Sequence, residues 1–172
     1  LQYFQDPYIA LNGGENFYPN KIAESIERIY KIGIPRSTLP FFMQLLKRVE
    51  EDSNFINEAL KILSRLESFL VRRAICGDAN AGLHAIFKRM WQDLEKEGVD
   101  INANNVMSFI KQTKEVAIPG DKEFEKQMTE KAIYKNKELC RFILEEFDQS
   151  LEGEFPQDKD ITIEHILPQK PG

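Results

Sequence analysis

Apolar residues recur at intervals of three and four along most of the chain, from residue 21 onward. That spacing places them on one face of an α-helix. Glycine and proline stand between the periodic runs, where they end or begin helices. The pattern predicts about seven helices, near residues 21–33, 37–52, 53–77, 79–97, 101–113, 121–131 and 136–151.

The apolar stripes of these helices predict a helical core. The longest run, residues 53–77, has Leu63 and Leu66 in the middle of its stripe, so both are expected to be buried. Residues 1–20 contain two prolines and a pair of glycines, which favour turns, so this segment is expected to be irregular. The predicted helical domain therefore covers residues 21–151.

The pattern changes near the C-terminus. Residues 152–160 are polar, contain a glycine and a proline, and are expected to form a linker. Ile161 and Ile163 then alternate with a threonine, which is the period of a β-strand, and Pro168 cannot continue a central ladder. The sequence therefore predicts a mainly α fold, in which a bundle of about seven helices is followed by a short terminal strand within residues 152–172.

Composition narrows the class of protein. The chain has 172 residues, 42% of them apolar and 30% charged, which is typical of a globular domain with its own core. No run approaches about eighteen apolar residues and no basic leader is present, so we expect no membrane span and a cytoplasmic location. The formal net charge of −5 argues against binding DNA through bulk charge, so a local patch or another segment would have to supply that contact.

Arg72 and Arg73 are candidate contacts for a phosphate or for a neighbouring domain. They lie near the end of the long third helix, where cations also interact favourably with the helix dipole, so a structural role stays open beside the functional one. His84, in the next helix, is expected to be structural or solvated. Cys76 and Cys140 lack zinc-ligand spacing and are expected to be reduced thiols.

The adjacent pair Glu164 and His165 carries the most specific chemistry in the sequence. A histidine accepts a proton from water near neutral pH, and a carboxylate is a suitable ligand for Mg²⁺ or Mn²⁺. Together the two groups fit a metal-dependent phosphodiesterase centre in which the base activates water. On spacing alone, a solvated surface pair without a catalytic role is the simpler interpretation.

The stretch "ITIEHILPQ", residues 161–169, resembles the first motif of HNH nucleases of the His-Me-finger, or ββα-metal, class. In that motif an acidic or histidine residue and a histidine close the first strand, and two apolar residues, a proline and a polar residue follow. More narrowly, the stretch is similar to the C-terminal nuclease domain of GmrSD-type, modification-dependent (type IV) restriction proteins. Two helical stretches resemble the same family, "FLVRRAICGDANAGLHAIF" at residues 69–87 and "LCRFILEEFDQSL" at residues 139–151. The similarity covers roughly residues 60–170, and the nine-residue motif is its specific part.

The resemblance implies a role for each member of the pair, with His165 as general base and Glu164 as metal ligand. It implies Mg²⁺ or Mn²⁺ as cofactor and DNA as the substrate of a full-length restriction endonuclease in bacterial defence. It also implies parts that are absent here: the N-terminal nucleotide-dependent sensor domain, the second strand and helix of the finger, and the remaining metal ligands. The chain is therefore expected to be a helical connector, inactive and metal-free by itself, with residues 152–172 as the truncated start of the nuclease domain.

Two other interpretations remain open. In one, the chain is a non-enzymatic helical interaction or coupling module whose "EHILPQ" stretch is not catalytic. In the other, it is an unrelated helical protein in which the stretch arose by chance. An asparagine or histidine on a helix after a second strand, in the sequence downstream, would favour the nuclease over both.

Overall fold

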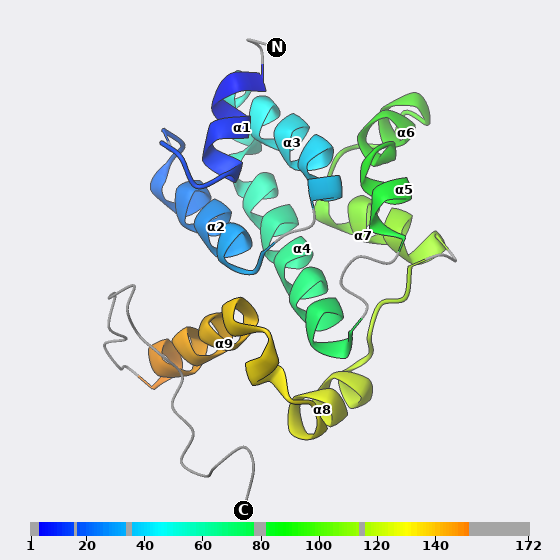
Figure 1. The fold of residues 1–172 in the computed structure, drawn as a ribbon. Coiled ribbons are helices and arrows are strands. Elements are labelled where there is room, and N and C mark those ends of the chain that lie inside the picture. The colour runs from blue at the N-terminus through cyan, green and yellow to red at the C-terminus, as the bar shows by residue number, and fades with distance from the viewer. Residues whose placement is uncertain (1–3, 16, 34–35, 78–81, 114–115, 152–172) are drawn as a thin grey trace, which may run out of the picture. The chain divides into compact units, whose positions relative to one another are not determined.

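The computed structural model describes residues 4–15, 17–33, 36–77, 82–113 and 116–151. Within these ranges the chain forms nine α-helices and no strand (Figure 1). The helices are α1 (Gln5–Leu11), α2 (Asn20–Lys31), α3 (Leu39–Glu51), α4 (Ile56–Cys76), α5 (Leu83–Phe87), α6 (Met90–Lys96), α7 (Ala103–Gln112), α8 (Asp121–Glu130) and α9 (Lys137–Ser150). The predicted mainly α fold is confirmed, while the predicted terminal strand at residues 161–165 lies outside the described residues.

Two helical segments differ from the sequence-based expectation. Residues 5–11 form α1, although the segment 1–20 was expected to be irregular. Pro7 lies in the first turn of α1, where a proline is tolerated, and Ala10 and Leu11 are buried. Residues 79–97 were expected to form one helix, but the chain leaves the helical path near Arg89, between α5 and α6. The apolar spacing continues across this break, so the sequence pattern contains no sign of it.

The chain divides into two compact units, residues 1–131 and residues 132–172. The first unit contains α1 to α8, and the described part of the second contains α9 and the short 3₁₀ turn Ile133–Lys135. This division falls earlier in the chain than the predicted boundary after residue 151. A separate domain beginning at residue 152 therefore stays a prediction.

Helix α4 organises the first unit. It packs against α2, α3, α7 and α8, and Figure 1 shows it crossing between the α1–α3 group and α7. Leu63 and Leu66 have no exposed surface, which confirms that the apolar stripe of this helix faces the core. The helix ends at Cys76 and is capped by Gly77, whose positive φ of 92° is a conformation that favours glycine.

A cluster of aromatic rings joins α3 to α5 and α6. The Phe41 ring lies edge-on to three others, with centroid distances of 6.2 Å to Phe42, 5.9 Å to Phe87 and 5.7 Å to Trp91. Phe42 also stacks on Phe87 at 6.3 Å. Because Phe41 and Phe42 have no exposed surface, this cluster is part of the core and needs no cofactor to explain it.

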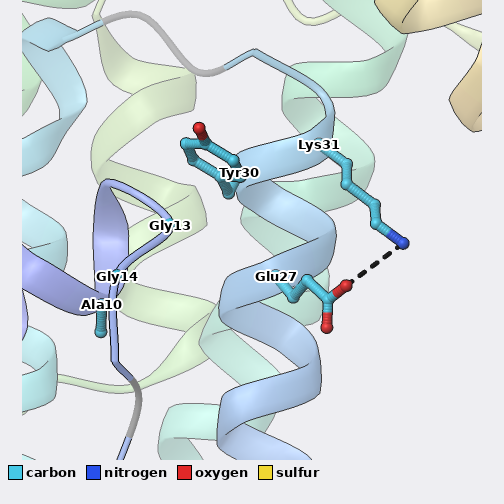
Figure 2. A pocket seen from close by; sticks show the side chains of 6 residues that line it. All are labelled: Ala10, Gly13, Gly14, Glu27, Tyr30 and Lys31. Carbon is cyan, nitrogen blue, oxygen red and sulfur yellow. Dashed lines mark ion pairs between the residues drawn. The ribbon is translucent and has the colours of Figure 1, made fainter. Parts of the chain in front are cut away.

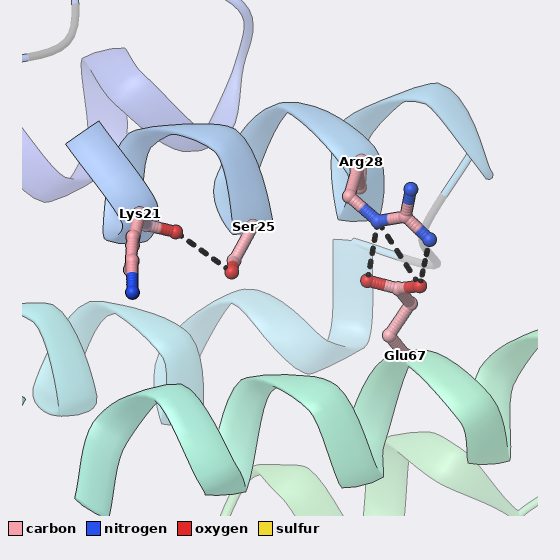
Figure 3. A network of polar contacts seen from close by, with 4 residues as sticks. All are labelled: Lys21, Ser25, Arg28 and Glu67. Carbon is pink, nitrogen blue, oxygen red and sulfur yellow. Dashed lines mark hydrogen bonds and ion pairs between the residues drawn. The ribbon is translucent and has the colours of Figure 1, made fainter. Parts of the chain in front are cut away.

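Polar contacts fix the outer elements of the first unit onto this core. The Arg28 guanidinium on α2 donates to both carboxylate oxygens of Glu67 on α4, and its Nη2 lies 2.7 Å from Oε1 (Figure 3). The Tyr18 hydroxyl donates to Glu50 Oε1 on α3 at 2.6 Å. Burial and the adjacent Glu50 carboxylate both raise the pKa of the Tyr18 hydroxyl, so it stays protonated and can keep donating.

Glu58 connects α4 to the first turn of α7. Its Oε1 accepts a hydrogen bond of 2.9 Å from the Ala103 backbone N–H, one of the amides that a helix start leaves without an intrahelical partner. Lys61 Nζ lies 3.1 Å from Oε2. The backbone hydrogen bond, and to a lesser extent Lys61, lower the pKa of the Glu58 carboxyl.

Glu58→Gln should therefore lower the free energy of unfolding by about 1 kcal/mol near pH 7, because an amide accepts more weakly than a carboxylate at a partly exposed site. A depressed folded-state pKa stabilises the protein above the unfolded-state value of about 4.3, and this stabilisation is lost as the pH falls through the folded-state pKa. Urea unfolding from pH 7 to pH 3 should show the difference between wild type and Glu58→Gln shrinking toward zero. Glu95→Gln, at an exposed position, is the control, and a difference for Glu58→Gln that stays constant with pH would contradict the assignment.

Candidate functional site

The predicted catalytic pair Glu164 and His165 lies in residues 152–172, outside the described part of the chain. Their roles as metal ligand and general base therefore stay predictions. Within the described ranges, no group of three or more His, Cys, Asp or Glu side chains is arranged to hold a metal ion. The case for a metal thus depends on the chemistry of the predicted pair, a carboxylate beside an imidazole.

Arg73, one of the two candidate arginines, is buried. Its side chain is 1% exposed, and its Nη1 donates to the backbone carbonyl of Ala117 at 2.6 Å. The guanidinium lies 5.6 Å from the centroid of the Phe69 ring one turn earlier on α4. Arg73 therefore fastens the segment that leads into α8 to the C-terminal end of α4.

Arg72 contacts α8 directly. Its Nη1 lies 2.7 Å from Asp121 Oδ1, at the first residue of α8, and its guanidinium lies 4.9 Å from the Phe124 ring centroid. Lys131, just after α8, donates from Nζ to the Ile75 carbonyl at 2.6 Å and thereby satisfies one of the last carbonyls of α4. We call Arg72, Arg73 and Lys131 the basic cluster.

The basic cluster holds α8 mainly through polar contacts. All ten residues of α8 are described and none of them is buried, so the helix contributes little to the hydrophobic core. Both arginines are engaged with groups of the same unit, and a phosphate would have to compete with Asp121 for Arg72. The predicted phosphate or domain contacts of Arg72 and Arg73 stay predictions. Their internal role has no local sequence signal, because the partners lie more than forty residues away along the chain.

The remaining chemistry-bearing side chains in the described residues are dispersed. His84 on α5 is exposed, in agreement with a solvated histidine. Cys76 and Cys140 are partly buried thiols, and burial raises the pKa of the Cys140 thiol. A raised pKa lowers the fraction of thiolate at neutral pH, so the structure gives Cys140 no features of a nucleophile.

Tyr30 lines two open hollows on the first unit. The first, of about 310 Å³, is drawn in Figure 2 and is lined by Ala10, Gly13, Gly14, Glu27, Tyr30 and Lys31. The second, of about 370 Å³, is lined by Leu11, Asn12, Tyr30, Gly33, Arg36 and Leu39. In the first, Lys31 Nζ is paired with Glu27 Oε1 at 3.3 Å. The described residues that line the two hollows include no histidine, cysteine or serine, so neither described lining combines a base with a nucleophile.

No helix in the described ranges combines the length and the apolar character that crossing a membrane requires.

Comparison with known proteins finds one family match, in the C-terminal part of the chain. Residues 118–172 match the family model of the GmrSD restriction endonucleases, C-terminal domain. The matched range begins directly after Ala117, includes α8 and α9, and continues through Glu164 and His165. No curated protein and no solved structure matches the chain significantly. The family match thus relates α8, α9 and the predicted motif to the C-terminal domain of restriction endonucleases.

Proposed function

We propose that residues 118–172 form part of the C-terminal nuclease domain of a modification-dependent restriction endonuclease of the GmrSD type, which hydrolyses DNA phosphodiester bonds with Mg²⁺ or Mn²⁺. The match of these residues to the C-terminal domain of that family carries the proposal. It is supported by the stretch "ITIEHILPQ", which lies inside the matched range and carries the expected base and metal ligand.

Each member of the pair has a distinct role in the proposed reaction. His165 accepts a proton from the attacking water, for which an imidazole is suited near neutral pH. Glu164 supplies a carboxylate oxygen, the ligand type that Mg²⁺ and Mn²⁺ prefer. The bound metal would stabilise the negative charge that develops on the phosphate oxygens.

We assign catalysis to the full-length protein and a connecting role to the helical unit. Glu164 and His165 provide two groups, whereas a hydrolytic metal site also needs further ligands that are held in place by their own hydrogen bonds. In this proposal, α8 and the basic cluster attach the nuclease domain to the helical unit. Residues 1–172 alone are expected to leave plasmid DNA intact in the presence of Mg²⁺ or Mn²⁺.

The test is cleavage by the full-length protein of plasmids with and without modified bases, with Mg²⁺ or Mn²⁺ and the nucleotides that restriction enzymes use. His165→Ala should reduce the cleavage rate about 10²–10⁴-fold, the usual contribution of a general base. His84→Ala, at the other histidine of the chain, is the matched control and should retain the wild-type rate. Glu164→Gln should raise the metal concentration needed for cleavage, whereas Glu125→Gln on the surface of α8 should not.

Cleavage that survives His165→Ala would refute the assigned base. Sustained nicking by residues 1–172, abolished by His165→Ala, would show that the site needs no further ligands. If the full-length protein cleaves none of these plasmids, the non-enzymatic coupling module becomes the better account of the helical unit.

A further inference from the structure

Helix α9 is apolar on two opposite faces. Leu139 and Phe142 on one face are 3% and 5% exposed, and Glu145 on the same face is 6% exposed. The side chains of Leu144, Phe147 and Leu151, at intervals of three and four, lie on the other face and are 44%, 54% and 79% exposed. A surface helix normally has one apolar face, so the second predicts a further packing partner for α9.

A buried carboxylate oxygen next to this exposed face is a second indication that α9 has a further packing partner. Asp148 is four residues after Leu144 and three before Leu151, which puts it beside both on the helix surface. Its Oδ2 is shielded from solvent and has no hydrogen-bond donor among the described residues. A shielded carboxylate oxygen without a donor is costly, and a partner that covers this side of α9 can supply one.

We propose that the exposed face of α9, formed by Leu144, Phe147 and Leu151, is the docking surface for residues 161–167 of the same chain. This segment contains four large apolar side chains, Ile161, Ile163, Ile166 and Leu167. The proposal rests on the nuclease function proposed above, because it assigns α9 as the support that holds the Glu164–His165 motif.

The length of the intervening chain fits this partner. The nine residues 152–160 can span about 30 Å when extended, and α9, with 14 residues, is about 21 Å long. Ile161 can therefore reach any point along the exposed face. The family match treats α9 and the motif as one continuous domain, which favours this segment over a partner from another chain.

Disulfide trapping in the full 172-residue chain tests the docking. With Cys76→Ser and Cys140→Ser as background, Phe147→Cys is combined with Ile163→Cys and oxidised at low protein concentration. The matched control combines Gln149→Cys, an exposed position on the opposite side of α9, with Ile163→Cys. Docking should give an intramolecular disulfide about tenfold faster for the first pair than for the control, because the two Cα atoms must approach within about 7 Å.

A second measurement avoids the introduced cysteines. Phe147→Ala should increase trypsin cleavage after Lys159 several-fold, while Phe17→Ala, at an aromatic residue that is 80% exposed, should not. Equal trapping of both cysteine pairs, trapping between two chains, or unchanged proteolysis in Phe147→Ala would overturn the docking. None of these results depends on DNA cleavage, so an inactive full-length protein with fast trapping would refute the proposed nuclease and leave the docking intact.

Discussion

Phe41→Ala should lower the free energy of unfolding by about 3–5 kcal/mol, the usual cost of removing a fully buried aromatic ring. The loss combines the apolar surface that the ring buries with the cavity that remains, because Phe42 on α3, Phe87 on α5 and Trp91 on α6 all contact the ring. Urea denaturation followed by far-UV circular dichroism and by Trp91 fluorescence measures the change. Trp91 lies in the same cluster, so both signals should report the same transition.

Phe17→Ala is the matched control for Phe41→Ala. The Phe17 side chain is 80% exposed, so its truncation should change the free energy of unfolding by less than about 0.5 kcal/mol. If Phe41→Ala costs no more than Phe17→Ala, the aromatic cluster is not part of the core and the packing of α3 against α5 and α6 is wrong.

The sequence pattern predicts most helices because each buries a continuous apolar stripe. Leu63 and Leu66 illustrate this: their spacing alone placed them on the core side of α4, and both are fully buried. The break near Arg89 was missed because the apolar spacing continues through it. Helix α1 was missed because Pro7 and the nearby glycines outweighed a short apolar run, although Ala10 and Leu11 are buried.

The candidate site depends on other kinds of information. The internal roles of Arg72 and Arg73 depend on Asp121 and Ala117, which lie far along the chain and meet the arginines only in the folded unit. Helical periodicity contains no signal for such contacts. The roles of Glu164 and His165 come from the resemblance of the motif to a known family, to which the comparison adds the match over residues 118–172.

Arg73→Met should lower the free energy of unfolding by about 1–3 kcal/mol, mainly because the charge-assisted hydrogen bond from the buried Arg73 guanidinium to the Ala117 carbonyl is lost. Methionine is close to arginine in length and can still pack against Phe69, which limits the contribution of lost packing. Arg72→Met is a neighbouring comparison with a different environment, because the Arg72 side chain is 30% exposed and its partner Asp121 is largely exposed. That ion pair should contribute less than about 1 kcal/mol.

The effects of Arg72→Met and Arg73→Met on stability should differ in their dependence on salt. At about 1 M NaCl the screening length falls to about 3 Å, so most of the effect of Arg72→Met should disappear. The effect of Arg73→Met should remain, since its hydrogen bond is shielded from solvent by burial. Amide exchange across α8 should accelerate in both variants at low salt but only in Arg73→Met at high salt. An Arg73→Met effect that vanishes with salt would mean that the guanidinium is solvated, and that the basic cluster does not fasten the segment before α8 to the helical unit.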